Sequence, residues 1–348
     1  MQFIKSDINI DFIGKRKIAF SLSVIMILVS VASLLIHRGP RLGIDFNGGT
    51  LIQVKFEQPV RIDDIKQGLK QIDLGKPSVQ QFGDQTDNEF LIRTDKSITT
   101  AQKLTQTLEN ALQAASGAKA EIRRVEMVGP QVGQDLREKA LFAMFYALLF
   151  ITIYISGRFE LKWILSGVMA AALMGAVYIL SLFNVSIPLL MVAALIITIV
   201  LFWLLELRFA MGAIVALIHD VIITVGIFSI FDKEFTLPII AALLTIIGYS
   251  LNDTIIVFDR IRENLRKYHK NPLEFIINRS VNETLGRTIL TSVTTLAVVV
   301  TLFFLGGGII QDFAFAMIVG VLIGTYSSVY VASPIILALQ VKKGKRKR

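Results

Sequence analysis

The chain has 348 residues, of which 53% are hydrophobic and 18% are charged, and its mean hydropathy is +0.63. A soluble globular domain carries about 25% charged residues, so this composition indicates an integral membrane protein. The absence of cysteine excludes a disulfide framework and a thiolate metal site, and three scattered histidines argue against a histidine metal site. The net charge of +9 does not indicate nucleic-acid binding, because the basic residues gather beside apolar segments.

The N-terminal region predicts a short lead and a membrane anchor. Residues 1–17 are polar and end in the basic run GKRK, which predicts a cytoplasmic lead. The apolar run at residues 18–36 predicts a first transmembrane helix. A secretory signal peptide is the competing interpretation, but the run is long and no small-residue cleavage site follows it.

Residues 38–136 are polar and of mixed charge, and they predict a small α+β domain outside the cytoplasm. GGTLIQVKFE alternates like a strand, RIDDIKQGLKQI has helical spacing, and SVQQFG and EFLIRTD look like two further strands. TTAQKLTQTLENALQAA is an amphipathic helix, and AKAEIRRVEMV predicts a last strand. The order β-α-β-β-α-β is that of a ferredoxin-like sandwich.

Residues 137–340 predict a transmembrane helical bundle. Seven apolar runs follow the first, which makes about eight spans in all, and we expect them at residues 138–157, 163–183, 188–206, 209–231, 237–258, 286–305 and 313–339. An even number of spans places both termini on one side. The basic segments GKRK, RIRENLRKYHK and KKGKRKR select the cytoplasm, with 341–348 as a basic tail. Residues 38–136 would then lie in the periplasm of a Gram-negative cell.

The bundle contains a weak internal repeat. Residues 157–195 and 207–243 share RF, then SLF or SIF, then AAL in the same order. The first copy lacks the polar residues of the second. Residues 161–207 are therefore interpreted as an inserted or duplicated hairpin that fills space, while chance similarity between apolar helices remains the alternative.

One carboxylate lies inside an apolar span. The stretch GYSLNDTIIVFDRIREN, residues 248–264, places Asn252 and Asp253 in the sixth span, where a charge costs at least a few kcal/mol. Helical spacing puts Tyr249 and Ser250 one turn before Asp253. Burial favours the neutral carboxyl and a nearby cation favours the carboxylate, so a group between these influences can bind and release protons. The alternative is a helix-end charge hydrated at the cytoplasmic interface.

A cation is available in the next span. NETLGRTILTSVTTLAVVV begins this span with Arg287, and Thr291 and Thr294 follow on the same helical face. A polar stripe in an apolar helix indicates a bundle interior or a hydrated path, in which Arg287 would control the proton affinity of Asp253. Alternatively, Arg287 extends its side chain to the lipid headgroups.

His219 and Asp220 lie near the middle of the fifth span. They are adjacent, so they point in different directions and need not pair with each other. Each is either a proton carrier or part of a structural hydrogen-bond network. Asp232 and Asp312 lie in short outer turns, where a solvated carboxylate needs no further role.

The sequence contains no signature of nucleotide or metal chemistry. There is no G-x-x-x-x-G-K-[ST] phosphate loop and no H-E-x-x-H motif, and GIDFNGGT is better explained as a strand and tight turn than as a phosphate site. We therefore expect no cofactor and no enzyme. Any work that this protein does would therefore have to draw on an ion gradient. One charge that moves through a potential of 100 mV yields about 2.3 kcal/mol.

These segments resemble the SecD/SecF family of protein-export membrane proteins, in the resistance-nodulation-division (RND) superfamily. The resemblance is carried by GIDFNGGT, VEMVGPQVG, ALIHD, IGYSLNDTIIVFDRIREN, NETLGRTILTS and LIGTYSSVYVASPI, which extend over nearly the whole chain. It implies an RND-type bundle in the bacterial inner membrane. It also implies an auxiliary subunit that works with SecD to couple the proton motive force to preprotein export through SecYEG. YajC, YidC, unfolded preproteins and membrane lipid are further implied partners.

The resemblance assigns expected roles to residues. Asp253, Arg287 and Thr291 match the proton pathway of the family, whereas Asn252, Asp220 and His219 are secondary candidates from the residues themselves. The outer domain is expected to handle the emerging chain together with a larger domain of SecD. The extra residues 161–207 depart from the usual six spans, and this puts the standard contact surface with SecD in doubt.

Two other functions stay open. A small-molecule exporter of the RND superfamily would usually have two repeated halves with a large outer domain in each. A passive membrane scaffold predicts that Asp253→Asn leaves function intact. The sequence also leaves open whether the coupling ion is a proton or sodium.

Overall fold

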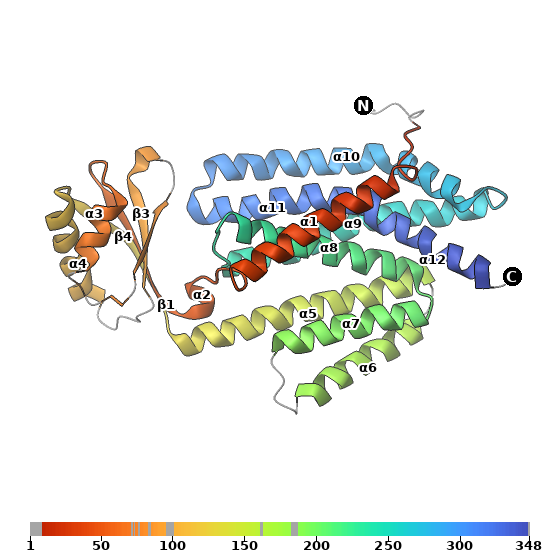
Figure 1. The fold of residues 1–348 in the computed structure, drawn as a ribbon, viewed down its shortest axis with the longest axis horizontal. Helices are drawn as coiled ribbons and strands as arrows, with labels where there is room; N and C mark the ends of the chain where they lie inside the picture. The colour runs from red at the N-terminus through yellow and green to blue at the C-terminus, as the bar shows by residue number, and fades with distance from the viewer. Residues whose placement is uncertain are drawn as a thin grey trace.

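The computed structural model describes residues 9–70, 72, 74–75, 77–82, 85–94, 101–160, 163–181 and 187–346. A small α+β domain projects from one end of a long helical bundle (Figure 1). The first and last bundle helices begin and end at the opposite end (Figure 1). The predicted fold class, a multi-pass helical membrane protein with a small α+β domain, is confirmed.

Eight apolar helices of the described chain build the bundle. Six are long and apolar enough to cross a membrane, namely α1 (Arg16–Ile36), α5 (Pro130–Glu160), α8 (Arg208–Ile230), α9 (Leu237–Lys267), α10 (Leu273–Leu305) and the continuous helix Gly308–Leu339. The last of these comprises α11 (Gly308–Ser327), the π-helix η2 (Ser328–Ala332) and the first part of α12 (Ser333–Arg346).

The other two helices are shorter. Helix α6 (Trp163–Ser181) has 19 residues and α7 (Ile187–Leu204) has 18, so they are about 27–29 Å long at 1.5 Å per residue. A bilayer core is about 30 Å thick, and the apolar described stretches of these helices are shorter than those of the other six. Six of the eight predicted spans therefore have full spanning length, and the number eight rests on α6 and α7.

The outer domain has the predicted β-α-β-β-α-β order. It consists of β1 (Gly49–Phe56), α3 (Ile62–Leu69), β2 (Ser78–Phe82), β3 (Glu89–Thr94), α4 (Ala101–Ser116) and β4 (Ala120–Val128). The strands form one antiparallel sheet in the order β2-β3-β1-β4, the arrangement of a ferredoxin-like sandwich. Every second side chain of β1 and β3 is buried against α3 and α4. This explains why apolar and polar residues alternate along these strands in the sequence.

The GIDFNGGT segment forms the junction between domain and bundle. Ile44–Asn47 form the short helix α2, and β1 begins only at Gly49, so the expectation of a strand and tight turn is wrong for the first half of the segment. Gly48 has φ +74°, and a Cβ there would lie 2.8 Å from the backbone of Pro130. This glycine lets the chain turn while α5 approaches closely.

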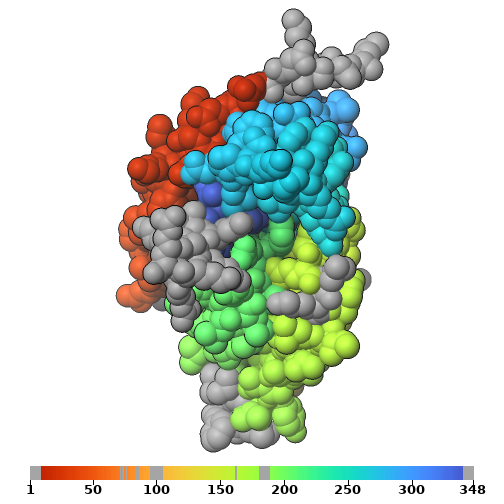
Figure 2. All heavy atoms as spheres, turned by 90° about the vertical axis from the view of Figure 1, so that its right-hand side faces the viewer, coloured from red at the N-terminus to blue at the C-terminus, as the bar shows by residue number. Residues whose placement is uncertain are grey.

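The hairpin of α6 and α7 lies on one side of the bundle, against α5 and α8 (Figure 1). In the view onto the end opposite the outer domain, these segments, yellow-green to green, extend away from α1 (Figure 2). The two ends of the hairpin lie in contact, at the end of α5 and the start of α8. The rings of Phe159 and Phe209 stack with their centroids 5.5 Å apart, and Glu160 accepts a hydrogen bond from the Phe209 N–H at 3.2 Å. The polar residues of the candidate site lie on α1, α8, α9, α10, α11, η2 and the start of α12.

Candidate functional site

Asp253 is a buried and unpartnered carboxyl group. It lies on α9 with 0% of its side chain exposed, and neither carboxylate oxygen has a hydrogen-bond partner among the described residues. An unsatisfied buried acceptor costs about 1–3 kcal/mol, and more when it is charged. The fold therefore tolerates this residue at a cost to its stability.

The hydroxyl groups one turn before Asp253 do not support it. Ser250 donates to the Asp220 carboxylate at 2.5 Å, and the Tyr249 hydroxyl donates to Ser292 on α10 at 3.3 Å. The sequence placed these hydroxyls correctly on the face of Asp253. The geometry shows that their hydrogen bonds join α9 to α8 and α10 instead.

Two threonines near Arg287 lie on α10, which packs against α9. Thr288 is 2% exposed, and its hydroxyl is likewise buried without a partner among the described residues. Thr291 interacts with the Asp253 carboxylate, but its hydroxyl hydrogen bonds to the carbonyls of Arg287 and Thr288 at 3.1 and 2.9 Å. Asp253 and Thr291 thus mark a polar position between α9 and α10 at which the carboxylate is not saturated with hydrogen bonds.

The structure does not bring Arg287 or Asn252 into this position. Both side chains are exposed, and no ion pair joins Arg287 to Asp253. The buried face of α10 carries Thr284, Thr288 and Ser292. Arg287 lies one position away from this face, on the outside of the isolated chain.

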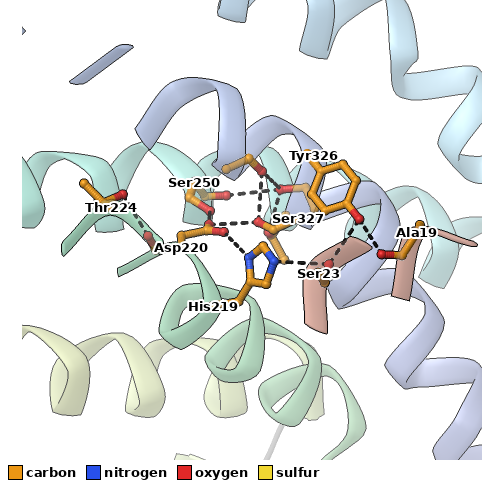
Figure 3. Close-up of polar contacts among 11 residues, drawn as sticks. Ala19, Ser23, His219, Asp220, Thr224, Ser250, Tyr326 and Ser327 are labelled. Atoms are coloured by element: carbon orange, nitrogen blue, oxygen red, sulfur yellow. Dashed lines mark hydrogen bonds and ion pairs between the residues drawn. The ribbon is translucent and has the colours of Figure 1, made fainter. Parts of the chain in front are cut away.

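His219 and Asp220 form the centre of a second, saturated cluster (Figure 3). Although they are adjacent in sequence, His219 Nδ1 lies 2.9 Å from Asp220 Oδ1, and both side chains are at most 3% exposed. The other oxygen, Oδ2, accepts hydrogen bonds from Ser250 at 2.5 Å and from Ser327 at 2.8 Å. Asp220 thereby joins α8, α9 and α11.

The cluster continues from His219 to α1. His219 Nε2 lies 3.2 Å from Ser23 Oγ, which is 3.1 Å from the Tyr326 hydroxyl, and Tyr326 donates to the carbonyl of Ala19 at 2.6 Å (Figure 3). These contacts form an unbroken series of hydrogen bonds from α1 through α8 to α11. The arrangement can hold the helices together and can also carry a proton along its members.

A π-helix lies beside both clusters. Thr254 on α9 is 2.9 Å from Ser328 at the start of η2, and Ser333 donates to the Ser328 carbonyl at 2.9 Å. π-helical turns interrupt the regular ladder and often occur at functional sites. Here the turn places a hydroxyl of the last transmembrane helix next to the neighbour of Asp253.

Sequence reasoning missed several of these residues. Ser23, Ser327, Ser328 and Thr288 are buried hydroxyls in apolar helices, and each belongs to one of the two clusters or to their border. Their signal was present, because a hydroxyl that interrupts an apolar run usually faces another helix. The described residues contain no group of three or more His, Cys, Asp or Glu that could hold a metal ion.

Two protein-family models match the chain. Residues 107–199 and 174–342 match the model of the protein export membrane protein SecD/SecF, C-terminal, and residues 33–60 match the SecD/SecF GG motif. The two longer matches overlap over residues 174–199, inside the hairpin.

Curated relatives match along nearly their whole length. Protein translocase subunit SecF of Magnetococcus marinus is 44% identical over 343 residues, which cover 97% of this chain and 94% of the relative. The SecF subunit of Vibrio alginolyticus is 38% identical over 342 residues, with 98% and 93% covered.

Solved structures of SecDF share the fold. The crystal structure of SecDF, a translocon-associated membrane protein from Thermus thermophilus, matches with a TM-score of 0.71 and 30% identity over 97% of this chain. SecDF in a super-membrane-facing form matches with a TM-score of 0.63 and 30% identity over 98% of this chain. In both cases the chain spans 40% of the length of the SecDF chain. The chain therefore belongs to the SecD/SecF family of protein-export membrane proteins, a family of non-enzymatic translocase subunits, and its full-length relatives are SecF subunits.

Proposed function

We propose that this chain is the SecF-type half of a SecD–SecF complex that uses the proton motive force to drive preproteins through SecYEG. Asp253 is the group that takes up and releases the coupling ion. The observation that carries this proposal is its buried carboxyl group, unpartnered and next to the hydroxyl-bearing face of α10. A proton bound there cancels the charge and lowers the cost of burial, so loaded and empty states differ in free energy.

The exposed polar face of α9 and α10 supports SecD as the partner. Along α9, the exposed positions Ala241, Thr245, Gly248 and Asn252 are small or polar and follow helical spacing. Small residues on a membrane helix permit close approach of another helix. Arg287 is exposed on the neighbouring α10, where lipid is an unfavourable surrounding for a guanidinium group.

Docking of SecD on this face would complete the ion path. The partner's helices would enclose Arg287 and bring polar groups to the unsaturated position between Asp253 and Thr288. The expected pathway Asp253, Arg287 and Thr291 is then assembled at an interface rather than inside one chain. His219, Asp220 and Asn252 remain secondary members of this proposal.

The membrane orientation follows from the charge distribution. Helix α1 begins, and α12 ends, at the end of the bundle away from the α+β domain (Figure 1). The basic segments at residues 14–17, 260–270 and 342–348 favour the cytoplasm for this end. The domain between residues 38 and 136 then lies in the periplasm, where it meets emerging unfolded chains together with SecD. YajC and YidC are further candidate partners.

Translocation into inverted membrane vesicles tests the proposed function. Vesicles carry this chain with SecD and SecYEG, and translocation of a preprotein is measured with and without an imposed proton gradient. We expect Asp253→Asn to abolish the stimulation by the gradient at normal protein levels, whereas the exposed outer residue Asp135→Asn leaves it unchanged. Full stimulation in Asp253→Asn would favour the passive scaffold. Failure to copurify with SecD would favour a solute exporter.

A further inference from the structure

The turn between α8 and α9 carries charged residues that all have partners. This outer turn, Asp232–Phe235, has the sequence DKEF, in which Asp232 was expected, like Asp312, to be a solvated carboxylate with no further role. Asp232 pairs with Arg41 at 2.8 Å, and Lys233 pairs with Asp312 on α11. Glu234 pairs with Arg93 on strand β3 and lies 3.7 Å from Arg41.

Arg93 provides a direct contact between the outer domain and the outer turn. Its side chain is 15% exposed and that of Glu234 is 16% exposed, so this ion pair is largely removed from water. An exposed ion pair is weak and easily exchanged, but removing one partner of a buried pair leaves an uncompensated charge. The contact therefore favours one orientation of β3 relative to the turn.

Main-chain hydrogen bonds attach the same turn to the base of the outer domain. Phe235 N–H donates to the Arg41 carbonyl at 2.7 Å, and Gly43 N–H donates to the Phe235 carbonyl at 2.8 Å. A Cβ at Gly43 would lie 2.8 Å from the Thr236 side chain and 3.2 Å from the Phe235 carbonyl oxygen, so a larger residue would crowd this approach. These two hydrogen bonds join the segment between α1 and β1 to the outer turn.

The N-terminus of α9 is capped from this segment. Thr236 occupies the N-cap position without a side-chain hydrogen bond, and Asp45 of α2 accepts one from the Leu237 N–H at 2.9 Å. A carboxylate at a helix N-terminus is favoured by the free N–H groups and the helix dipole. Asp253 lies sixteen residues further along this helix, a distance of about 24 Å at 1.5 Å per residue.

We propose that the outer turn couples the orientation of the outer domain to the ion-loading state of Asp253, with Arg93, Glu234 and Asp45 as positioning residues. A shift of α9 on loading is transmitted through its capped N-terminus to the turn, and from the turn to β3. By thermodynamic reciprocity, a load on the outer domain changes the ion affinity of Asp253. This inference rests on the proposed function and assigns a route between the two parts of the chain.

A distance measurement on the full SecD–SecF complex tests the coupling. The chain has no cysteine, so Lys119→Cys at the far end of the outer domain and Leu305→Cys at the exposed end of α10 accept two spin labels in a complex with cysteine-free SecD. The distance distribution is compared between the parent chain and Asp253→Asn, which mimics the loaded carboxyl. We expect the distribution to shift.

The same comparison is then made in the double variant Arg93→Gln, Glu234→Gln. We expect the shift to disappear and the gradient-stimulated translocation to fall to the level of Asp253→Asn, while copurification with SecD persists. The matched control is Lys55→Gln, Glu89→Gln, which removes an ion pair inside the outer domain and keeps the shift. Asp45→Ala, which removes the acceptor of the Leu237 N–H, serves as a second, independent test of the same route.

Three results would overturn the coupling. The first is the same shift in the Arg93→Gln, Glu234→Gln background as in the parent chain. The second is the absence of any shift between the parent chain and Asp253→Asn. The third is full gradient stimulation in the double variant while Asp253→Asn has none, a result that would leave the proposed function standing and remove only the route.

Discussion

Ser250 and Asp253 lie one turn apart on α9, but only Ser250 is satisfied. Its hydroxyl donates to Asp220 at 2.5 Å, whereas both oxygens of Asp253 are buried without a partner among the described residues. Asp220 instead accepts from three side chains. The bundle therefore holds the Asp220 carboxylate in a complete hydrogen-bond network, whereas burial of the Asp253 carboxyl costs stability. A buried polar group without a partner is an exception that is expected at functional positions.

Removal of the Asp253 carboxyl is expected to stabilise the protein. Asp253→Leu replaces two unsatisfied acceptors by an apolar side chain of similar length, which relieves a penalty of about 1–3 kcal/mol. Thermal unfolding of the purified chain in detergent should shift to higher temperature, although gradient-stimulated translocation is lost. A lower midpoint, with Asp135→Asn unchanged as the control, would show that Asp253 has partners that stabilise it.

The opposite effect is expected at Asp220. Asp220→Ala leaves His219, Ser250 and Ser327 without their common acceptor, and each hydrogen bond inside a membrane protein contributes about 0.6 kcal/mol on average and up to about 2 kcal/mol. The unfolding midpoint should fall clearly. Asp220→Asn keeps the shape of the side chain and one acceptor oxygen, so its unfolding midpoint should lie between those of Asp220→Ala and the parent chain. Equal midpoints for all three would mean that the cluster does not hold α8, α9 and α11 together.

Sequence patterns predicted the membrane helices and the strands well, because each of these elements has a strong pattern within its own residues. Hydropathy over 20 residues marks a span, and alternation marks the buried faces of β1 and β3. The orientation of α10 was not predictable in this way. Arg287, Thr291 and Thr294 form one polar stripe, and Thr284, Thr288 and Ser292 form a second stripe one position away. Which stripe faces α9 is decided by tertiary packing.

Two contacts were beyond sequence reasoning for a similar reason. Adjacent helical residues start about 100° apart, yet the side chains of His219 and Asp220 bend toward each other at 2.9 Å because Ser250 and Ser327 hold the carboxylate. Asp232 was expected to be solvated, but Arg41 pairs with it from 191 positions earlier, and Arg93 lies against Glu234 from 141 positions earlier. Long-range polar contacts of this kind depend on how the outer domain sits on the bundle.

The hairpin is expected to be dispensable for folding. Glu160 and Phe209 are in hydrogen-bond contact at 3.2 Å, so a chain that lacks residues 161–207 can be closed by a short linker without moving α5 or α8. The surfaces thereby exposed are apolar and would face lipid, which costs little inside a membrane. We expect the shortened chain to accumulate in the membrane and to retain the dependence on Asp253.

Membrane levels and gradient-stimulated translocation measure this outcome. Deletion of α3 (Ile62–Leu69), whose Ile65 and Leu69 lie in the core of the outer domain, is the control that should fail. Loss of the shortened chain from the membrane would show that α6 and α7 carry packing that the rest of the bundle needs. Normal levels without translocation would instead assign the hairpin to a contact with a partner.

The crossing of α1 and α8 depends on Gly226. A Cβ at this position would lie 2.1 Å from the Cβ and 2.6 Å from the Cα of Ser30, so α1 would have to move away. Such overpacking costs about 1–3 kcal/mol. It would also separate Ser33 from Ser229, now 2.9 Å apart. Gly226→Val is therefore expected to lower the thermal midpoint in detergent.

Gly175→Val in α6 is the matched control for this substitution. A Cβ at Gly175 meets nothing within 4 Å, so the same change of residue type should leave the midpoint nearly unchanged. Because α1 carries the chain into the outer domain, its displacement by Gly226→Val should also weaken gradient-stimulated translocation. Equal midpoints for the two variants would show that α1 is held by lipid and partner contacts rather than by its packing against α8.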